Sequence, residues 1–465
     1  MLFNSYEFLF FLLPIILAGY YLFLPKASRH VWLVLGSYVF YGWWDYRFCG
    51  LLLLTTAIDY MAGARIAASD DPVVKKRWLR LSICSDLSIL GFFKYFDLGA
   101  DTLNRLLEWG GGGAGLPMLH LVLPVGISFY TFQAMSYSID IYRGHARPAR
   151  SFVDFACYVS LFPQLVAGPI VRYHELDHQL RERSHSWAKG GAGVVLFVLG
   201  LSKKVLLADA LAPMADWSFS QPAIGMAGAW SGLLAYTLQI YFDFSGYSDM
   251  AVGLGLMLGF QFPQNFNSPY KSGSITEFWR RWHMSLSSWL RDYLYIPLGG
   301  NRKGEVRTYM NLVLTMLLGG LWHGANWTFV LWGAYHGMLL AIERVLGKRG
   351  FGWRLPGILQ GAITFLLVMG GWVLFRSPTI EGVRTMARGL TGGQGWGGIY
   401  PWQGTGLLAW AALFGGLGMV WCVKNTWELS WRPSWRLALG VMILFCACVM
   451  VVFVNSSSPF LYFQF

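Results

Sequence analysis

Long apolar runs separated by short polar segments dominate the sequence. Ten of these runs read as full spans, at residues 7–24, 30–48, 51–68, 78–97, 118–138, 190–212, 229–259, 356–375, 405–423 and 437–454. A helix of about 20 apolar residues crosses the hydrocarbon core of a bilayer, so each run is long enough to form a membrane helix. The runs are continuous and do not alternate with polar residues, which favours helices over the strands of a membrane barrel.

The run at 152–170 differs from the others, because basic segments flank it at both ends and it contains Pro163, Gly168 and Pro169. Basic segments mark the cytoplasmic side, whereas a full span would carry its two ends to opposite sides. We therefore expect a broken or re-entrant element here, which membrane proteins tolerate where protein surrounds the backbone.

The run at 308–341 is also flanked by basic residues at both ends. It is too long for one upright span and long enough for a hairpin, and His323 falls near its middle. The flanking charges favour a hairpin with both ends in the cytoplasm and His323 deep in the membrane. The alternative is a single, steeply tilted span.

Residues 274–295, before this run, read as one amphipathic helix. Ser274 followed by Glu277 forms a capping box at its start. The tryptophans and leucines fall on one face, and the three arginines, Arg280, Arg281 and Arg291, fall on the other. Such a helix is typical of a membrane interface; its arginines could also hold an anionic donor, and both roles stay open.

Composition supports an all-α membrane protein. The chain has 465 residues, of which 55% are hydrophobic and 13% charged, whereas soluble domains carry about 25% charged residues. We predict one integral membrane domain over 1–465, with about 10–12 membrane helices plus re-entrant elements and amphipathic cytoplasmic helices. The start of the chain lacks a basic region and a small-residue cleavage site, so the first run is expected to remain as a membrane helix.

The formal net charge of +12 is concentrated in short segments between the apolar runs. These segments, assigned to the cytoplasm, are 25–30, 65–80, 141–151, 171–189, 261–308, 342–355 and 424–436. The alternation that results places the N-terminus and the C-terminus outside. No basic stripe on a soluble domain suggests nucleic-acid binding, and the six cysteines show no metal-binding or disulfide pattern.

Ionisable side chains within apolar segments are the candidate chemistry, because they are costly there and mark functional sites. His323 is the strongest candidate, since a histidine can accept a proton near neutral pH. His283 lies on the apolar side of the amphipathic segment, where a structural role is at least as common. Asp243 and Asp249 could line a cavity or hold helices together. Two weaker candidates of the same kind are Asn326 and His336.

Several ordered motifs make the chain resemble the membrane-bound O-acyltransferase family, in particular its bacterial branch that acetylates exported polysaccharides. The motifs lie at 124–130, 162–169, 241–250, 276–283, 289–295, 298–302, 318–327 and 459–465, and they cover nearly the whole chain. The resemblance implies a fold that encloses a central tunnel. It identifies His323 as the catalytic histidine and His283, at the second signature position, as a second catalytic residue. The expected tunnel-lining or donor-binding residues are Arg280, Arg281, Arg291, Trp322, Asn326, Asp243 and Asp249; no metal is expected.

The function that the resemblance implies is acetyl transfer from cytoplasmic acetyl-CoA across the bacterial inner membrane, with no bound cofactor. Alginate is the first polymer expected, and cellulose or another exopolysaccharide the next, because the segment 424–436 is shorter than in the alginate proteins. An SGNH-type periplasmic acetyltransferase or another protein of the exopolysaccharide machinery is the expected partner. The rival readings are a non-catalytic transporter or channel, and a family member with other cargo, such as D-alanyl transfer to teichoic acid.

Overall fold

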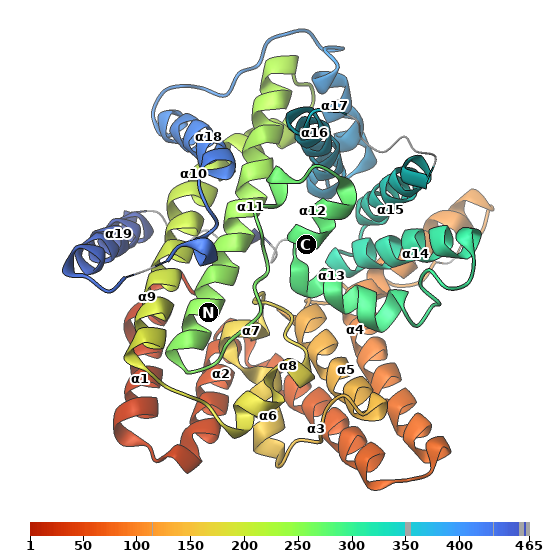
Figure 1. Ribbon diagram of the computed structural model, residues 1–465. Coiled ribbons are helices and arrows are strands. Elements are labelled where there is room, and N and C mark those ends of the chain that lie inside the picture. The colour runs from red at the N-terminus through yellow and green to blue at the C-terminus, as the bar shows by residue number, and fades with distance from the viewer. Residues whose placement is uncertain (114, 349–354, 431, 455–459, 462–465) are drawn as a thin grey trace. The chain divides into compact units, whose positions relative to one another are not determined.

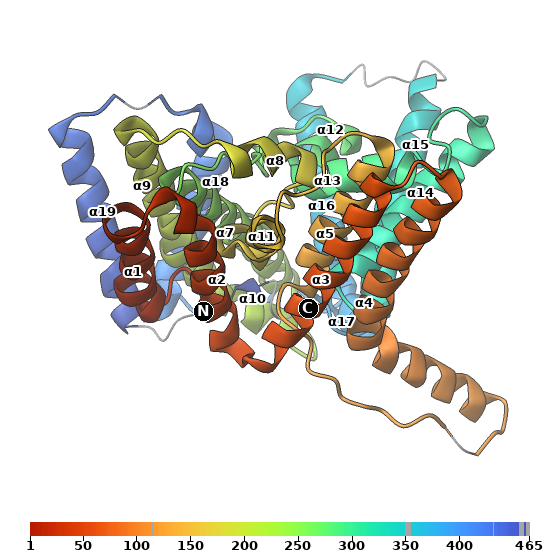
Figure 2. The same ribbon diagram turned by 90° about the horizontal axis from the view of Figure 1, so that it is seen from below.

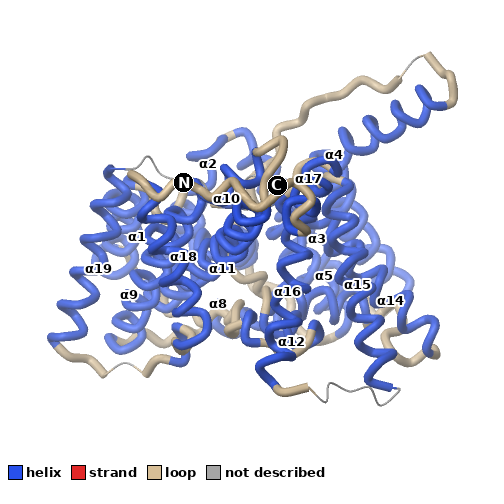
Figure 3. The backbone as a smooth tube through the Cα atoms, turned by 90° about the horizontal axis from the view of Figure 1, so that it is seen from above, coloured by secondary structure: helices blue, strands red, loops and turns tan. Residues whose placement is uncertain are grey.

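The computed structural model describes residues 1–113, 115–348, 355–430, 432–454 and 460–461. Helices and their connections account for all of these residues, and none of them lies in a strand (Figures 1 and 3). The predicted all-α class is therefore confirmed. Residues 349–354 of the basic segment 342–355, and the C-terminal motif apart from residues 460–461, lie outside the described residues.

The chain divides into two compact units. Unit 1 comprises Met1–Gly193 and Leu254–Pro263, and unit 2 comprises Val194–Gly253 and Gln264–Phe465. The single membrane domain expected over 1–465 stays a prediction.

Unit 1 contains the first eight α-helices. They are α1 (Leu13–Ala18), α2 (Arg29–Asp45), α3 (Arg47–Ala68), α4 (Pro72–Trp109), α5 (Ile127–Arg143), α6 (Phe152–Ser160), α7 (Phe162–Leu165) and α8 (Tyr173–Arg181). Two π-helical turns, η1 (Phe8–Leu12) and η2 (Gly19–Phe23), extend α1 in both directions, so the first apolar run is helical as far as Phe23. Unit 1 also contains the 3-10 turn η3 (Lys26–Ser28). Helices α3, α4 and α5 pack side by side (Figure 2).

Two apolar runs of unit 1 can be compared directly with their predicted structure. The run at 152–170 is broken as predicted, because α6 ends at Ser160 and the short α7 is followed by irregular, buried backbone. The run at 118–138 is not helical throughout, because α5 begins only at Ile127. The segment before α5 instead lies along α4, where the carboxylate of Asp97 accepts hydrogen bonds from the amides of Leu119 (2.8 Å) and Leu121 (3.2 Å).

Unit 2 contains the helices that follow along the chain. They are α9 (Trp187–Ser202, from Val194), η4 (Lys203–Ala208), α10 (Asp209–Ser220), α11 (Met226–Met257, to Gly253), η5 (Pro269–Lys271), α12 (Ile275–Arg281), α13 (Met284–Leu290), η6 (Arg291–Tyr295), α14 (Glu305–His323), α15 (Trp327–Lys348), α16 (Gly357–Arg376), α17 (Ile380–Leu390), α18 (Thr405–Cys422), η7 (Thr426–Glu428) and α19 (Trp435–Val454). The short amphipathic helix α17 has no counterpart among the predicted runs.

The predicted continuous helix at 274–295 is wrong. Ser274 caps its start as expected, since its hydroxyl accepts a hydrogen bond from the amide of Glu277 at 3.1 Å. The helix then stops at Arg281, and α13 begins only at Met284. The break falls at His283, whose backbone is in the left-handed region (φ 43°), and periodicity alone could not reveal it.

The hairpin predicted for 308–341 is confirmed, as α14 and α15 lie side by side and run antiparallel (Figures 2 and 3). Their backbones touch at two glycines. A Cβ atom on Gly320 would lie 2.2 Å from the carbonyl oxygen of Phe329, and one on Gly333 would lie 2.3 Å from that of Met316. His323 is at the tip of this hairpin. The cytoplasmic placement of its two ends stays a prediction.

Five helices in the described ranges are both long enough and apolar enough to cross a membrane. They are α3, α15 (through Gly347), α16, α18 and α19. Other long helices, such as α11 with Asp243 and Asp249, carry more polar residues. The chain is thus a polytopic membrane protein, and the larger count of 10–12 spans stays a prediction.

Candidate active site

His323 is the last residue of α14 and is only 5% exposed. At this position it lies beside the last carbonyl groups of the helix. Those carbonyls form the negative end of the helix dipole, which stabilises a positive charge by about 0.3–1 kcal/mol. The position therefore suits a histidine that becomes an imidazolium when it accepts a proton.

Three aromatic rings surround the His323 imidazole, and together we call them the aromatic box. The ring centroids of Trp322 and Trp332 lie 5.1 Å from that of His323, and the centroid of Phe375 lies 5.2 Å away. Because Trp332 belongs to α15 and Phe375 to α16, three helices meet at this imidazole. Trp332 and Phe375 were not predicted, since buried aromatic residues usually belong to a core.

His283 occupies the break between α12 and α13 and is fully buried. Its left-handed backbone costs about 1–2 kcal/mol for a residue other than glycine, and strain of this kind clusters at functional sites. Two backbone hydrogen bonds hold the break. The amide of Met284 donates to the carbonyl of Asn265, and the amide of Asn267 donates to that of Arg281, both at 2.9 Å.

The side chain of Asn265 fixes which ring nitrogen of His283 carries a proton. Its Oδ1 accepts a hydrogen bond from the backbone amide of Ser285 (3.2 Å) and another from the Ser285 hydroxyl (2.9 Å). An oxygen held in this way can only accept, so His283 Nδ1, at 3.1 Å, is the donor. In the neutral ring the lone pair is therefore on Nε2. Burial lowers the pKa of His283 to about 3, which keeps the ring neutral at physiological pH.

The two histidines predicted for one site share a neighbour. The His283 ring lies 6.1 Å from the Trp322 ring and 4.6 Å from that of Phe244, between centroids. Trp322 also belongs to the aromatic box of His323. The structure thus brings His283, Trp322 and His323 together, although His283 and His323 are far apart in sequence. Asn265 belongs to the same group, and no motif or spacing along the chain could have identified it.

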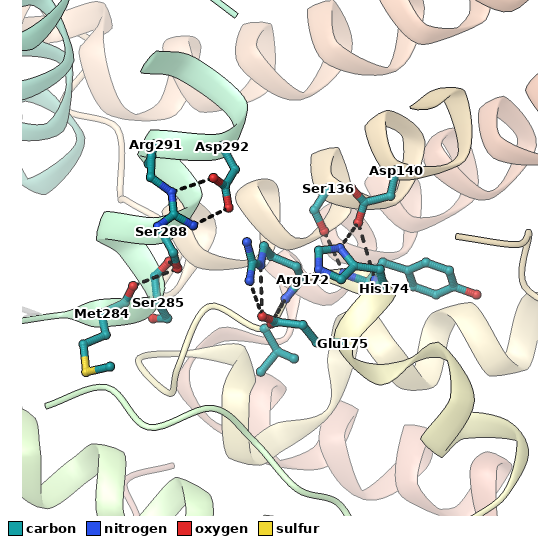
Figure 4. A network of polar contacts seen from close by, with 12 residues as sticks. Ser136, Asp140, Arg172, His174, Glu175, Met284, Ser285, Ser288, Arg291 and Asp292 are labelled. Atoms are coloured by element: carbon teal, nitrogen blue, oxygen red, sulfur yellow. Dashed lines mark hydrogen bonds and ion pairs between the residues drawn. The ribbon is translucent and has the colours of Figure 1, made fainter. Parts of the chain in front are cut away.

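The three arginines proposed for donor binding differ in their environment. Arg281 forms an ion pair with Glu277 (2.7 Å), and Arg291 forms a two-fold contact with Asp292 at 2.7 and 2.9 Å (Figure 4). Arg280 is exposed and forms no ion pair with any residue that the structure describes. Of the three guanidinium groups, that of Arg280 is the one most available to an external anion.

Asp243 and Asp249 are neutralised by lysines of η4. Lys204 Nζ lies 2.7 Å from Asp243 Oδ1, and Lys203 Nζ lies 2.6 Å from Asp249 Oδ2. The other carboxylate oxygen of Asp243, Oδ2, accepts a hydrogen bond from the amide of Leu461 (2.8 Å). These contacts favour the helix-joining role over the cavity-lining role for both aspartates. The adjacent lysines within the run 190–212 were the sequence signal for these ion pairs, because charges in a membrane require partners.

The remaining polar candidates have structural surroundings. Asn326 directly precedes α15; its side chain accepts a hydrogen bond from the amide of Thr328 (3.0 Å) and donates one to the carbonyl of Pro378 (2.8 Å). His336 is fully buried, and its ring centroid lies 5.0 Å from that of Trp332. Among the described residues, no group of three or more His, Cys, Asp or Glu side chains could hold a metal ion.

Unit 1 contains a pair of titratable side chains that was not predicted from the sequence. His174 Nδ1 lies 2.8 Å from Asp140 Oδ2 (Figure 4). This hydrogen bond to the carboxylate raises the pKa of His174 above its usual value. Two residues close to His174 in sequence, Arg172 and Glu175, also form an ion pair at 2.5 Å.

The chain is similar to proteins of one enzyme class. A model of the membrane-bound O-acyltransferase family matches residues 143–349. The chain is 45% identical to a probable alginate O-acetylase of Azotobacter vinelandii and 44% identical to one of Pseudomonas putida, with all of each chain covered. It is 34% identical to a peptidoglycan O-acetyltransferase of Helicobacter pylori, over all of this chain and 98% of the relative.

The similarity to these relatives extends over the whole chain, and the match to the family model includes His283 and His323. They agree with the helical fold and with a buried histidine at the meeting point of three helices. The chain therefore belongs to the membrane-bound O-acyltransferase family and is an O-acyltransferase.

Proposed function

We propose that this enzyme transfers acetyl groups from cytoplasmic acetyl-CoA for the O-acetylation of an exported polysaccharide, with alginate the first polymer to test. The observation that carries the proposal is the environment of His323, a nearly buried imidazole enclosed by the aromatic box. The full-length similarity to alginate O-acetylases supports acetyl as the cargo. Cellulose and other exopolysaccharides are the next polymers to test.

The proposed reaction needs one base. His323 takes the proton of an acceptor hydroxyl, and the hydroxyl oxygen attacks the thioester carbonyl carbon of acetyl-CoA. The carbon–sulfur bond then breaks, and the proton passes to the leaving thiolate, so the products are an acetyl ester and CoA thiol. His283 acts as a positioning residue, because its neutral Nε2 accepts hydrogen bonds but its lowered pKa disfavours taking a full proton.

The donor and the acceptor are proposed to reach His323 from opposite faces. Arg280 contacts the phosphates of CoA from the cytoplasm, where a guanidinium binds phosphate in a two-fold manner. The enzyme resides in the bacterial inner membrane with both termini in the periplasm. The acceptor is an SGNH-type acetyltransferase or another periplasmic protein of the exopolysaccharide machinery, or the polymer itself.

Labelled acetyl-CoA given to vesicles that contain the purified enzyme tests the proposal. With alginate or the partner present, the wild type should form a labelled ester, and His323→Ala should be slower by about 10²–10⁴-fold. His178→Ala is the matched control, since His178 is an exposed histidine in unit 1. Wild-type transfer by a folded His323→Ala enzyme would refute the role of His323. Uptake of label without ester formation would support a transporter, and transfer of D-alanyl instead of acetyl would change the cargo.

A further inference from the structure

Two half-buried arginines of unit 1 lack the carboxylate partner that such residues usually have. Arg29, the first residue of α2, has its guanidinium carbon 4.6 Å from the ring centroid of Tyr20 and 5.8 Å from that of Tyr21. Its Nε is buried and forms no hydrogen bond with any described residue. Because taking a charge out of water without a counter-ion is costly, this contact with two rings leaves the cation only partly compensated.

Arg183, in the segment after α8, is in a similar situation. Its guanidinium carbon lies 4.2 Å from the centroid of the Phe260 ring, and its buried Nε has no hydrogen bond to a described residue. One terminal nitrogen of Arg183 donates to His30 Nε2 at 2.8 Å. His30 in turn contacts Asp154 through Nδ1 at 2.5 Å. The carboxylate of this cluster is therefore bonded to a histidine and not to an arginine.

Both arginines influence the same neighbour. Burial lowers the pKa of His185, and the positive charges of Arg29 and then Arg183 lower it further. The ring of His185 is held by Tyr20, whose hydroxyl lies 2.9 Å from His185 Nε2 and donates to the carbonyl of Leu258 at 3.2 Å. These contacts connect the start of α2, the segment after α8 and the end of α11 around an excess of positive charge.

We propose that Arg29 and Arg183 bind the phosphodiester group of an anionic phospholipid of the cytoplasmic leaflet. A guanidinium donates two parallel hydrogen bonds to a phosphate, and two such groups would neutralise one lipid headgroup with charge to spare. Basic clusters at the cytoplasmic ends of membrane helices are known to attract anionic lipids. The segments 25–30 and 171–189, which contain the two arginines, are among those that their charge assigns to the cytoplasm.

The apolar surface beside the arginines distinguishes a lipid from a soluble phosphate. Leu22 and Phe23, just before Arg29, are 75% and 77% exposed, and Trp187, shortly after Arg183, is 98% exposed. Aromatic and aliphatic side chains exposed at the end of a membrane helix are typical of the level of lipid headgroups and upper acyl chains. A soluble phosphate would use the arginines and gain nothing from these three side chains.

Native mass spectrometry of the full chain tests this site. Wild-type protein in a neutral detergent is titrated with phosphatidylglycerol or with phosphatidylcholine, and the fraction carrying lipid is measured. We expect the wild type to prefer phosphatidylglycerol. Arg29→Gln and Arg183→Gln should each weaken that binding by about fivefold, and the double variant by more than tenfold, since one basic residue contributes about 1 kcal/mol near an anionic surface.

Arg147→Gln is the matched control, because Arg147 is an exposed basic residue of another cytoplasmic segment and its loss should leave lipid binding unchanged. Arg29→Lys and Arg183→Lys keep the charge and remove the planar fork, so they should bind between the wild type and the Gln variants. Equal retention of the two lipids by the wild type would overturn the proposal whether or not the variants fold. An equal loss in Arg147→Gln would do the same. Displacement of the lipid by millimolar glycerol phosphate would overturn the lipid as ligand in favour of a soluble phosphate.

Discussion

Replacing Asn265 by alanine is the perturbation that most directly tests the geometry around His283. Asn265 Oδ1 is the common acceptor for His283 Nδ1, the amide of Ser285 and the Ser285 hydroxyl. The side chain itself is proposed to touch neither substrate. Any loss of transfer in Asn265→Ala would therefore be exerted through the orientation and the tautomer of His283.

The structure sets the size of the expected effect. The hydroxyl of Ser285 can rotate to another acceptor, but its backbone amide and the His283 N–H cannot. Each buried donor left without an acceptor costs about 1–3 kcal/mol, so we expect a loss of about 2–6 kcal/mol in the free energy of unfolding. The loss of a group that orients a metal-bound histidine typically costs about 10–100-fold in activity, and we expect a loss of similar size here.

The assay is transfer of labelled acetyl groups in vesicles, with kcat and KM measured separately and folding monitored by size exclusion. We expect kcat to fall and KM for acetyl-CoA to change little. Ser285→Ala is the control, because it removes the hydrogen bond from the Ser285 hydroxyl and leaves Asn265 in place. This variant should lose about 1 kcal/mol in the free energy of unfolding. Should Asn265→Ala not accumulate, Asn265→Asp keeps the acceptor oxygen and should fold. A folded Asn265→Ala enzyme with wild-type kcat would refute a role for the tautomer of His283.

Three further predictions concern unit 2. Burial lowers the pKa of His283 from 6.5 to about 3, so between these pH values the unfolded chain binds a proton that the folded chain does not. The free energy of unfolding is therefore highest above pH 6.5 and decreases as the pH falls towards 3, with a loss of about 2 kcal/mol at pH 5. Comparing thermal unfolding at pH 7 and pH 5, His283→Gln should lose less stability than the wild type, and an unchanged pH dependence would contradict this. Single cysteines at the exposed positions Val306 and Leu346, in a background without exposed cysteines, should be labelled from the cytoplasm only; labelling of either position from the periplasm would contradict the cytoplasmic placement of the two ends of the hairpin. Arg280→Gln should raise KM for acetyl-CoA with little change in kcat, and more than Arg281→Gln does, because Arg281 is already paired; a loss confined to kcat would indicate a direct role in the chemistry.

Local residue patterns sufficed to predict some structural features around the candidate site, whereas the catalytic role of His323 stays a prediction. An ionisable residue within the apolar run 308–341 singled out His323, and basic residues at both ends of that run predicted the hairpin. The capping pair Ser274 and Glu277 placed the start of α12 correctly. Each of these signals is contained in a short stretch of chain, because hydropathy, charge and capping act between near neighbours.

The sequence by itself determined that this is a helical membrane protein, because the bilayer requires about 20 apolar residues for each span and each span therefore appears as a continuous apolar run. It also indicated which histidine is exceptional. Only the tertiary structure decided that the helix after Ser274 breaks at His283, that Asn265 sets its tautomer, and that Lys203 and Lys204 neutralise Asp249 and Asp243. The physical reason is that these features depend on contacts between residues distant in sequence, where the free energy of packing and ion pairing overrides the local preference for an uninterrupted helix.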